Sequence, residues 1–366
     1  MDKNIFTFLF SLLNTPTPSG YEKKGAQLFD QFCSYLYGAK HEFTDNIGNV
    51  AYSIGHGSIP FMISGHIDEI ALQVQYIDDK GFIHFIKDGG VDPKTVIGRE
   101  VIIHSNGNEV LGVIGKTPIH VEFHTEANDK VTKLKDLKID IGAESKEDAE
   151  KLVAIGSPIT FSHYAKRLQG ERIVSGSIDD KVGVCVTAGV LERLSEYTKF
   201  HPLQNLVVYG VACTQEEVGG HGATIAAKRI NPAYSIDYDV TFATDDGSVS
   251  PDEWGDIKLG KGGCIAFGPD KDLDMANDII KVCNAESPYS PSRIPYQTFS
   301  VGAGMTNTLK IKLAADDCKT LLLSVPQRNM HTQVEVCDLR DIDSLINMTF
   351  NYIIWLDSQL CKKSNG

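Results

Sequence analysis

Three apolar runs in this chain each pass directly into acidic or histidine residues, and this feature constrains the fold more than any other. Each run has the length of a buried strand, and its polar residues come where the strand ends. Carboxylates at such a position cost folding free energy unless something pairs with them. We therefore expect the ends of these strands to meet around a shared partner. The segments are PFMISGHIDE (60–69), LVVYGVACTQEE (206–217) and YSIDYDVTFATDD (234–246).

Apolar residues at helical spacing lie between and after these runs. Strands that alternate with helices favour an α/β fold, in which helices cover both faces of a sheet and ligands bind at the carboxyl ends of the strands. The expected helices are DDKVGVCVTAGVLERLSEY (179–197), GATIAAKRI (222–230), DLDMANDIIKVCN (272–284) and DLRDIDSLINMTFNYIIWLDSQL (338–360).

The texture of the sequence changes between about residues 75 and 170. Short alternating runs such as GFIHFIKDGG (81–90) are joined there by turn signals, including Asn106-Gly107. We predict a β-rich insertion, residues 75–170, within one α/β domain formed by residues 1–74 and 171–366. A chain of 366 residues exceeds the size that one hydrophobic core usually supports, which favours two domains.

The composition excludes several classes of partner. A formal net charge of -13 argues against nucleic acid, because phosphate binding needs a basic face, and disfavours anionic membranes. The eight cysteines are scattered without a CxxC pair, and six lie in or beside apolar runs, which indicates reduced thiols and a cytoplasmic setting. We interpret IFTFLFSLL (5–13) as an amphipathic first helix and not as the core of a signal peptide, because it lacks a basic n-region and an A-x-A cleavage site. No apolar run approaches the roughly 18 residues of a membrane span.

Five segments place His, Asp or Glu at the end of a predicted strand or beside one. The donors are hard oxygens and two imidazoles, which suit zinc, cobalt or manganese, and two ions that share a carboxylate would use the set fully. None of the five segments contains a cysteine. They are Gly65-His66-Ile67-Asp68, Ile178-Asp179-Asp180, Glu216-Glu217, Asp237-Tyr238-Asp239 and Met330-His331.

The spacing within these segments indicates different tasks. His66 and Asp68 lie two apart on a strand and face the same way, so Asp68 can accept a hydrogen bond from the imidazole nitrogen that faces away from a metal. We expect one of Glu216 and Glu217 to bind a metal and the other to act on the water. A single strand-end carboxylate is more often a helix cap or a surface ion pair, and we assign Asp180 that structural task.

Other motifs carry less information. His120, Glu122 and His124 alternate in PIHVEFH and could clasp a metal, but an exposed strand face with mixed charges explains them equally well. The glycine-rich LGKGGC matches neither the phosphate-loop nor the dinucleotide pattern, and neither G-x-S-x-G nor HExxH occurs.

The order of these segments resembles that of the dinuclear metallo-aminopeptidases related to glutamyl aminopeptidase and the tetrahedral, or deblocking, aminopeptidases. The resemblance covers nearly the whole chain. It rests on SGHIDEIALQV, GSIDDKVGVCV, TQEEVGGHGA, DYDVTFATD and RNMHTQVEVCDLRDI, with further matches in LLNTPTPSGYE, VIGKTPIHV, DLKIDIGAES and RIPYQ.

This resemblance implies a role for each residue of the cluster. Asp179 would bridge two divalent metals, with His66 and Asp239 completing one site and Glu217 and His331 the other. Glu216 would be the general base, and Asp68 would support His66. The metals would be zinc, or else cobalt or manganese.

The family also implies an architecture. A phosphorylase/hydrolase-like α/β catalytic domain, with a mixed sheet between helices, would carry an inserted small β-barrel-like domain used in oligomerisation or substrate access. Homo-oligomers from dimers to dodecamers are expected. Departures from the family pattern at Lys181, His221, Asn307 and Gln333 lie near where a substrate would sit, so the preferred N-terminal residue stays open. A basic pocket for an acidic residue could use Lys181, His221 or Arg293.

The function that follows is a metal-dependent aminopeptidase, which hydrolyses N-terminal residues from peptides with a free N-terminus through a water activated by two metals and a glutamate base. One alternative is a cellulase-like glycoside hydrolase, in which Glu216 would act with Asp68 or Asp245. Another is an oligomeric binding or scaffold protein whose site is catalytically silent.

Overall fold

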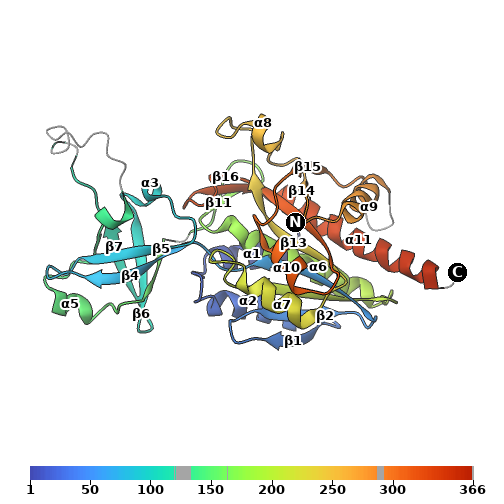
Figure 1. Ribbon diagram of the computed structural model, residues 1–366, viewed down its shortest axis with the longest axis horizontal. Coiled ribbons are helices and arrows are strands. Elements are labelled where there is room, and N and C mark those ends of the chain that lie inside the picture. Colours follow the sequence, from blue (N-terminus) through green and yellow to red (C-terminus); the bar gives the residue numbers. More distant parts are fainter. Residues whose placement is uncertain (119, 121–132, 163, 287–291, 365–366) are drawn as a thin grey trace.

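The computed structural model describes residues 1–118, 120, 133–162, 164–286 and 292–364. The chain forms a large α/β part and a smaller barrel that stands to one side of it (Figure 1). Glu122 and His124 of the alternating motif lie outside the described residues. This arrangement confirms the predicted fold class, a mixed sheet between helices with an added β-barrel.

Eleven strands of the described chain make the mixed sheet. At its centre β12, β3, β13 and β16 run parallel, so their carboxyl ends reach the same edge. The order is β1 (Lys40–Thr44), β2 (Val50–Ile54), β12 (Leu206–Cys213), β3 (Ile59–His66), β13 (Tyr234–Phe242), β16 (Lys319–Arg328), β17 (Glu335–Asp338), β11 (Arg172–Ser175) and β10 (Lys166–Arg167), with β14 (Gly263–Phe267) against β16 and β15 (Tyr296–Ser300) against β14. The three strands predicted from apolar runs are confirmed.

Helices cover both faces of the sheet, as the sequence pattern predicts. One face packs against α1 (Lys3–Leu13), α2 (Lys23–Ser34), α6 (Ile178–Thr198), α9 (Leu273–Asn284) and α11 (Leu339–Ser364) in the largest apolar core. The opposite face packs against α7 (His221–Ile230) and α10 (Asn307–Ala314) in a smaller core. The short helix α8 (Pro251–Trp254) lies in the connection between β13 and β14. The predicted first helix is α1, which the side chain of Asp2 caps by accepting from the amide of Asn4.

The barrel closes on itself and has a separate apolar core. Closure leaves no unpaired strand edge, which removes a template for aggregation. Its strands among the described residues are β4 (Ala71–Ile77), β5 (Ile83–Asp88), β8 (Ile139–Asp140), β7 (Asn108–Ile114), β6 (Glu100–Ser105) and β9 (Pro158–Phe161), accompanied by α3 (Pro93–Val96), η2 (Leu134–Asp136) and α5 (Lys146–Glu150). The exact domain limits at residues 75 and 170, and a task in oligomerisation, stay predictions.

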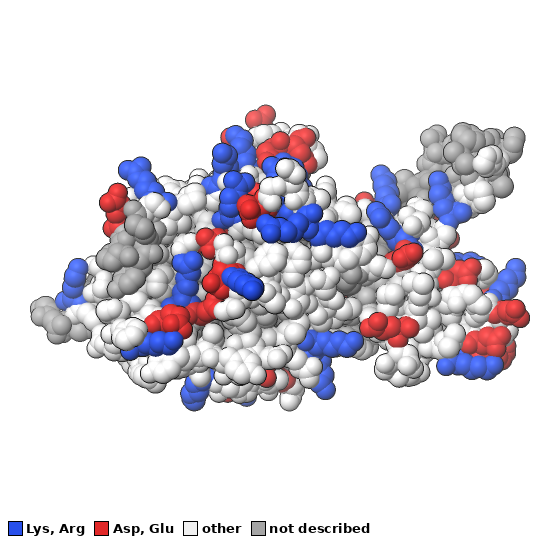
Figure 2. Space-filling model, turned by 180° about the vertical axis from the view of Figure 1, so that it is seen from behind, with Lys and Arg blue, Asp and Glu red and all other residues white. Residues whose placement is uncertain are grey.

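The surface carries charges of both signs. On the face shown in Figure 2, Lys and Arg lie among Asp and Glu over the barrel as well as over the α/β part. No helix in the described part of the chain combines the length and the apolar character needed to cross a bilayer. All eight cysteines lie within the described residues as free thiols, and all but Cys361 are buried.

Close packing of β3 on α6 sets the position of the strand edge. Both elements approach through glycines, so that main chain meets main chain without intervening side chains. A methyl group at Gly65 would collide with the main chain of Gly183 and would lie 2.5 Å from the amide nitrogen of Val184. His66 follows Gly65 at the end of β3, and α6 begins at Ile178. This contact therefore fixes the end of β3 relative to the start of α6.

We predict that Gly65→Ala forces β3 and α6 apart, because the colliding atoms are main chain and cannot turn away. Overpacking of this kind costs about 1–3 kcal/mol. The free energy of unfolding, measured by denaturant titration, should fall by that amount. Gly115→Ala is the matched control, since an added methyl group meets open space there. Equal stability of the two variants would contradict the prediction.

Candidate metal centre

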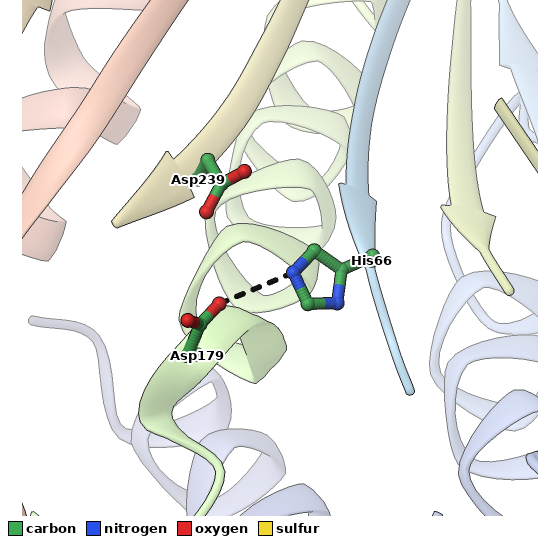
Figure 3. A group of neighbouring side chains, drawn as sticks. All are labelled: His66, Asp179 and Asp239. Carbon is green, nitrogen blue, oxygen red and sulfur yellow. Dashed lines mark hydrogen bonds and ion pairs between the residues drawn. The ribbon is translucent and has the colours of Figure 1, made fainter. Parts of the chain in front are cut away.

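Five segments meet at the edge where the parallel strands end. His66 is the last residue of β3, Asp239 lies on β13, and Asp179 lies at the start of α6. Figure 3 shows these three side chains pointing toward one another. Glu217 follows β12, and His331 follows β16. Residues that are far apart in the sequence are thus brought together, as the polar strand ends predict.

Asp179 belongs to two groups of potential ligands. One group is His66, Asp179 and Asp239, and the other is Asp179, Glu217 and His331; in each group the ligand atoms lie within 4.8 Å of one another. The Oδ1 atom of Asp179 lies 3.1 Å from Nε2 of His66, while Oδ2 lies 3.2 Å from Nε2 of His331. Each oxygen of one carboxylate therefore faces a different histidine, which is the arrangement of a bridging ligand.

The chemistry of these donors fits divalent metals. Each group combines one imidazole nitrogen with carboxylate oxygens, the set that zinc and similar ions bind. Side chains of the first group are buried, with His66 exposed by 1 %, Asp179 by 6 % and Asp239 by 7 %. Buried charges of this density need counter-charge, and cations would provide it.

The pKa values of the site reflect this crowding. Burial, followed by the charge of Asp179, raises the pKa of Glu217 to about 8, and burial raises the pKa of Asp239 well above its usual range. Burial would also raise the pKa of Asp179, but its hydrogen bonds with His331 and His66 lower it. The hydrogen bond with Asp179 raises the pKa of His331 to about 9. Cations that bind here would displace these protons, so binding should weaken as pH falls.

Asp68 holds the loop that carries the paired glutamates. Its Oδ1 accepts from the amide of Glu216 at 2.9 Å, and its Oδ2 accepts from the amide of Glu217 at 3.1 Å and from the hydroxyl of Ser19 at 2.6 Å. Nδ1 of His66 lies 3.2 Å from the main-chain oxygen of Asp68 and 3.5 Å from its Oδ1. The expected partner of His66 is therefore present, but the shorter contact is to main chain. Anchoring the glutamate loop is a task that the sequence did not indicate.

Two further buried carboxylates hold the main chain of the ligand segments. Asp180 accepts from the amides of His66 at 3.1 Å and Gly183 at 3.0 Å, so it joins β3 to the start of α6. Glu335 accepts from the amide of Asp179 at 3.1 Å and of His331 at 2.8 Å. The sequence analysis missed Glu335. Its only signal is an acidic residue in the alternating run VEVC, where a buried strand has no other reason for a charge.

Glu22 also anchors the loop that carries the paired glutamates. Its Oε1 accepts from the amides of Gly20 at 2.8 Å and of Gln215 at 3.2 Å. The side chain is buried, and burial raises the pKa of Glu22 from 4.5 to about 7. The loop before Glu216 is thus fixed by a buried acid whose ionisation the fold disfavours.

Two of the positions that depart from the family pattern, Lys181 and His221, belong to neither ligand group. Lys181 is buried, donates to the main-chain oxygen of Thr15 at 2.7 Å and forms an ion pair with Glu69 at 3.3 Å. His221 is exposed and contacts the side chain of Gln215 at 3.1 Å. Lys181 is therefore committed to the fold and cannot reach out to a substrate.

The sequence profile of the family described as M42 glutamyl aminopeptidase matches residues 48–348. The chain belongs to this family. It is 32% identical over 350 residues to the lysyl aminopeptidase of Pyrococcus furiosus, an alignment that covers 92% of this chain and 93% of that protein. The resemblance inferred from the five segments is confirmed.

Solved structures of TET peptidases share the whole fold. The TET aminopeptidase of the marine sediment archaeon Thaumarchaeota archaeon SCGC AB-539-E09 superposes with a TM-score of 0.86 at 25% identity, covering 96% of this chain and 97% of that one. The TET1 peptidase of Pyrococcus horikoshii gives a TM-score of 0.81 at 30% identity, covering 95% and 98%. The α/β part and the barrel therefore occur together in these peptidases.

The raised pKa of Glu22 predicts a pH-dependent difference in stability. Below about pH 4.5 the carboxyl is protonated in both states. Between pH 4.5 and 7 only the unfolded chain loses this proton, so the folded protein loses stability as pH rises, by roughly 3 kcal/mol at and above pH 7. Glu22→Gln keeps the accepting oxygen and removes the charge. The free energy of unfolding of the variant, relative to that of the wild type, should therefore increase as pH rises from 4.5 to 7.

Denaturant unfolding at several pH values between 4.5 and 8 measures this gain. Glu100→Gln, at an exposed position, is the control. If the difference in the free energy of unfolding between Glu22→Gln and the wild type does not change with pH, burial does not perturb the pKa of this carboxyl.

Proposed function

We propose that this M42 chain is a metal-dependent aminopeptidase that releases the N-terminal residue of peptides. The observation that carries the proposal is the carboxylate of Asp179, whose two oxygens each face a histidine of a different ligand group. Two divalent ions would use that arrangement fully. Zinc fits the donors best, and cobalt or manganese are compatible with them.

Each residue of the cluster has a place in the proposal. His66 and Asp239 would hold one ion, Glu217 and His331 would hold the other, and Asp179 would contact both. When bound, such ions supply positive charge that polarises a carbonyl group and acidifies water.

Glu216 is the proposed general base. It lines the same cavity as the ligands but belongs to neither ligand group. Burial raises the pKa of Glu216, which makes its carboxylate a better proton acceptor. Its carboxylate would take a proton from water as the oxygen adds to the peptide carbonyl carbon. The same proton would then pass to the leaving nitrogen as the C–N bond breaks.

Asp68 would act as a positioning residue. It holds the amides of Glu216 and Glu217, and so sets the direction of both side chains. The negative charge of the cluster also favours a protonated α-amino group, which explains why such a site would act on free N-termini.

A homo-oligomer in the cytoplasm is part of the proposal. The related Pyrococcus horikoshii TET1 peptidase can assemble into a tetrahedron or a large octahedral shell. By likeness, assemblies from dimers to dodecamers are expected for this chain, with the barrel as a contributor. The free thiols support a reducing compartment.

In the glycoside hydrolase alternative the second carboxylate would be Asp68 or Asp245, and both already have partners. Asp68 is fully buried and accepts three hydrogen bonds. Asp245 forms an ion pair with Arg328 at 2.8 Å and accepts from the amide of Leu259. Neither is positioned to serve as a partner for Glu216 in sugar chemistry.

We predict that dialysis against a chelator abolishes hydrolysis of aminoacyl-anilides and short peptides, and that zinc, cobalt or manganese restores it. Elemental analysis should find two ions per chain. Asp179→Asn should weaken the binding of both ions, because this carboxylate faces both histidines. Asp239→Asn should weaken the binding of only one ion. Activity that survives chelation would contradict the metal requirement.

The two alternatives have separate signatures in this experiment. Sugar release that persists without metal would favour a glycoside hydrolase. Stoichiometric metal with no hydrolysis of any peptide would favour a silent binding protein. If the Asp179→Asn variant retains one ion per chain with unchanged affinity, Asp179 does not bridge the two sites.

We predict that Glu216→Gln lowers kcat by roughly 10²–10⁴-fold, because the amide cannot accept the proton. Metal content and thermal stability should match those of the wild type, since Glu216 belongs to neither ligand group. Glu217→Gln is the comparison and should lose metal. Near-normal turnover of the Glu216 variant would refute its role as a base.

A further inference from the structure

A cavity of about 490 Å³ opens beside the metal centre. All five proposed metal ligands and Glu216 lie in its wall, so a substrate held at the metals has part of its structure in this space. The volume lies within the range of small-molecule sites, roughly 300–1,000 Å³. The rest of the wall decides what kind of group the cavity can receive.

The wall away from the metals is mostly apolar and aromatic. Phe242 lies on β13, just past the metal ligand Asp239, and its ring meets the ring of Trp254 edge-on at a centroid distance of 4.6 Å. Leu322 of β16 and Phe299 of β15 belong to one buried apolar cluster, against which Val301 packs. These side chains line the cavity together with the proposed ligands.

The charges in the wall all belong to the metal centre. Among the described residues that line the cavity, none is Lys or Arg, and the only acids are the ligands and Glu216. Lys181, His221 and Arg293, which could have formed a basic pocket, are absent from the described lining. A charged side chain in this cavity would lose its hydration without gaining a partner, whereas an apolar side chain would gain by leaving water.

We propose that this cavity receives the side chain of the N-terminal residue, and that the preferred substrates are peptides that begin with a large apolar residue such as Leu, Met or Phe. The assignment rests on the proposed aminopeptidase function and adds its substrate class. It differs from the acidic and basic preferences that the names of the family and of the Pyrococcus furiosus relative express.

Met305 offers a way to test the wall without disturbing the core. It lines the cavity and is 59% exposed, so a charged replacement can remain partly hydrated. The turn before it is held firmly. Asp270 accepts from the amide of Gly304 at 3.2 Å, and Lys271 donates to the oxygen of Gly302 at 3.4 Å. A replacement at Met305 therefore changes the charge of the cavity more than its shape.

The first experiment compares kcat/KM of the metal-loaded full chain for anilides of Phe, Leu, Met, Ala, Glu and Lys. The large apolar residues should lead Glu and Lys by at least about tenfold. Phe-Ala-Ala should also lose its first residue faster than Ala-Phe-Ala. A kcat/KM for the Glu or Lys anilide that equals or exceeds the values for the apolar residues overturns the proposal. A preference set by the second residue of the peptide overturns it too.

The second experiment places a charge in the cavity. Met305→Glu should raise the Lys-to-Phe ratio of kcat/KM by roughly tenfold or more, and Met305→Lys should raise the Glu-to-Phe ratio in the same way. Leu313→Glu and Leu313→Lys are the matched controls, because Leu313 is 75% exposed and lies outside the described lining. Ratios that do not move in the Met305 variants overturn the assignment of this cavity.

The outcomes separate this proposal from the function on which it rests. If the metal-loaded protein hydrolyses none of the anilides or peptides, the aminopeptidase proposal fails and the substrate assignment fails with it. If hydrolysis occurs with a charged preference, the aminopeptidase proposal stands and only the assignment of the cavity is wrong.

Discussion

The two oxygens of Asp179 face two histidines that come from distant parts of the chain, and the site is organised around this contact. His66 ends a strand near the start of the α/β part, while His331 follows a strand near its end. Because the ligand groups share one carboxylate, neither can be complete without it. Packing of β3 on α6 through Gly65 and Gly183 sets the distance at which this contact forms. The fold thus positions the ligand groups through main-chain contact as well as through side chains.

Buried carboxylates outside the two ligand groups hold the segments in place. Asp68 and Glu22 accept amides of the glutamate loop, Asp180 joins β3 to α6, and Glu335 accepts amides on either side of the centre. Main-chain amides satisfy these acids, so they add rigidity without competing for the position of a cation. Phe242 of β13 and Leu322 of β16 belong to the apolar part of the cavity wall, where aromatic and aliphatic surface replaces charge. In the proposed function, the catalytic groups and the cavity that selects the substrate side chain would therefore be adjacent.

Much of the fold could be predicted because its signals are local. An apolar run that ends in acidic residues, or apolar residues at helical spacing, requires only neighbouring letters, and β3, β12, β13 and α6 follow from such patterns. The metal ligands could be proposed because parallel strands end at one edge, where their polar residues must meet. Only the family resemblance implied a barrel, since pairing of β4 with β9 joins residues far apart in sequence and leaves no local trace.

By itself, then, the sequence determined which residue types stand at the strand ends, and with them a cluster of oxygens and imidazoles suited to cations. The resemblance of five ordered segments identified the family. Only the tertiary structure decided the rest. In the folded chain, Asp68 and Glu335 accept hydrogen bonds from main-chain amides. Lys181 is buried beside Glu69, and Trp254 lines the cavity. These outcomes depend on contacts between distant segments, whose free energy comes from packing and burial and is set only when the whole chain has folded.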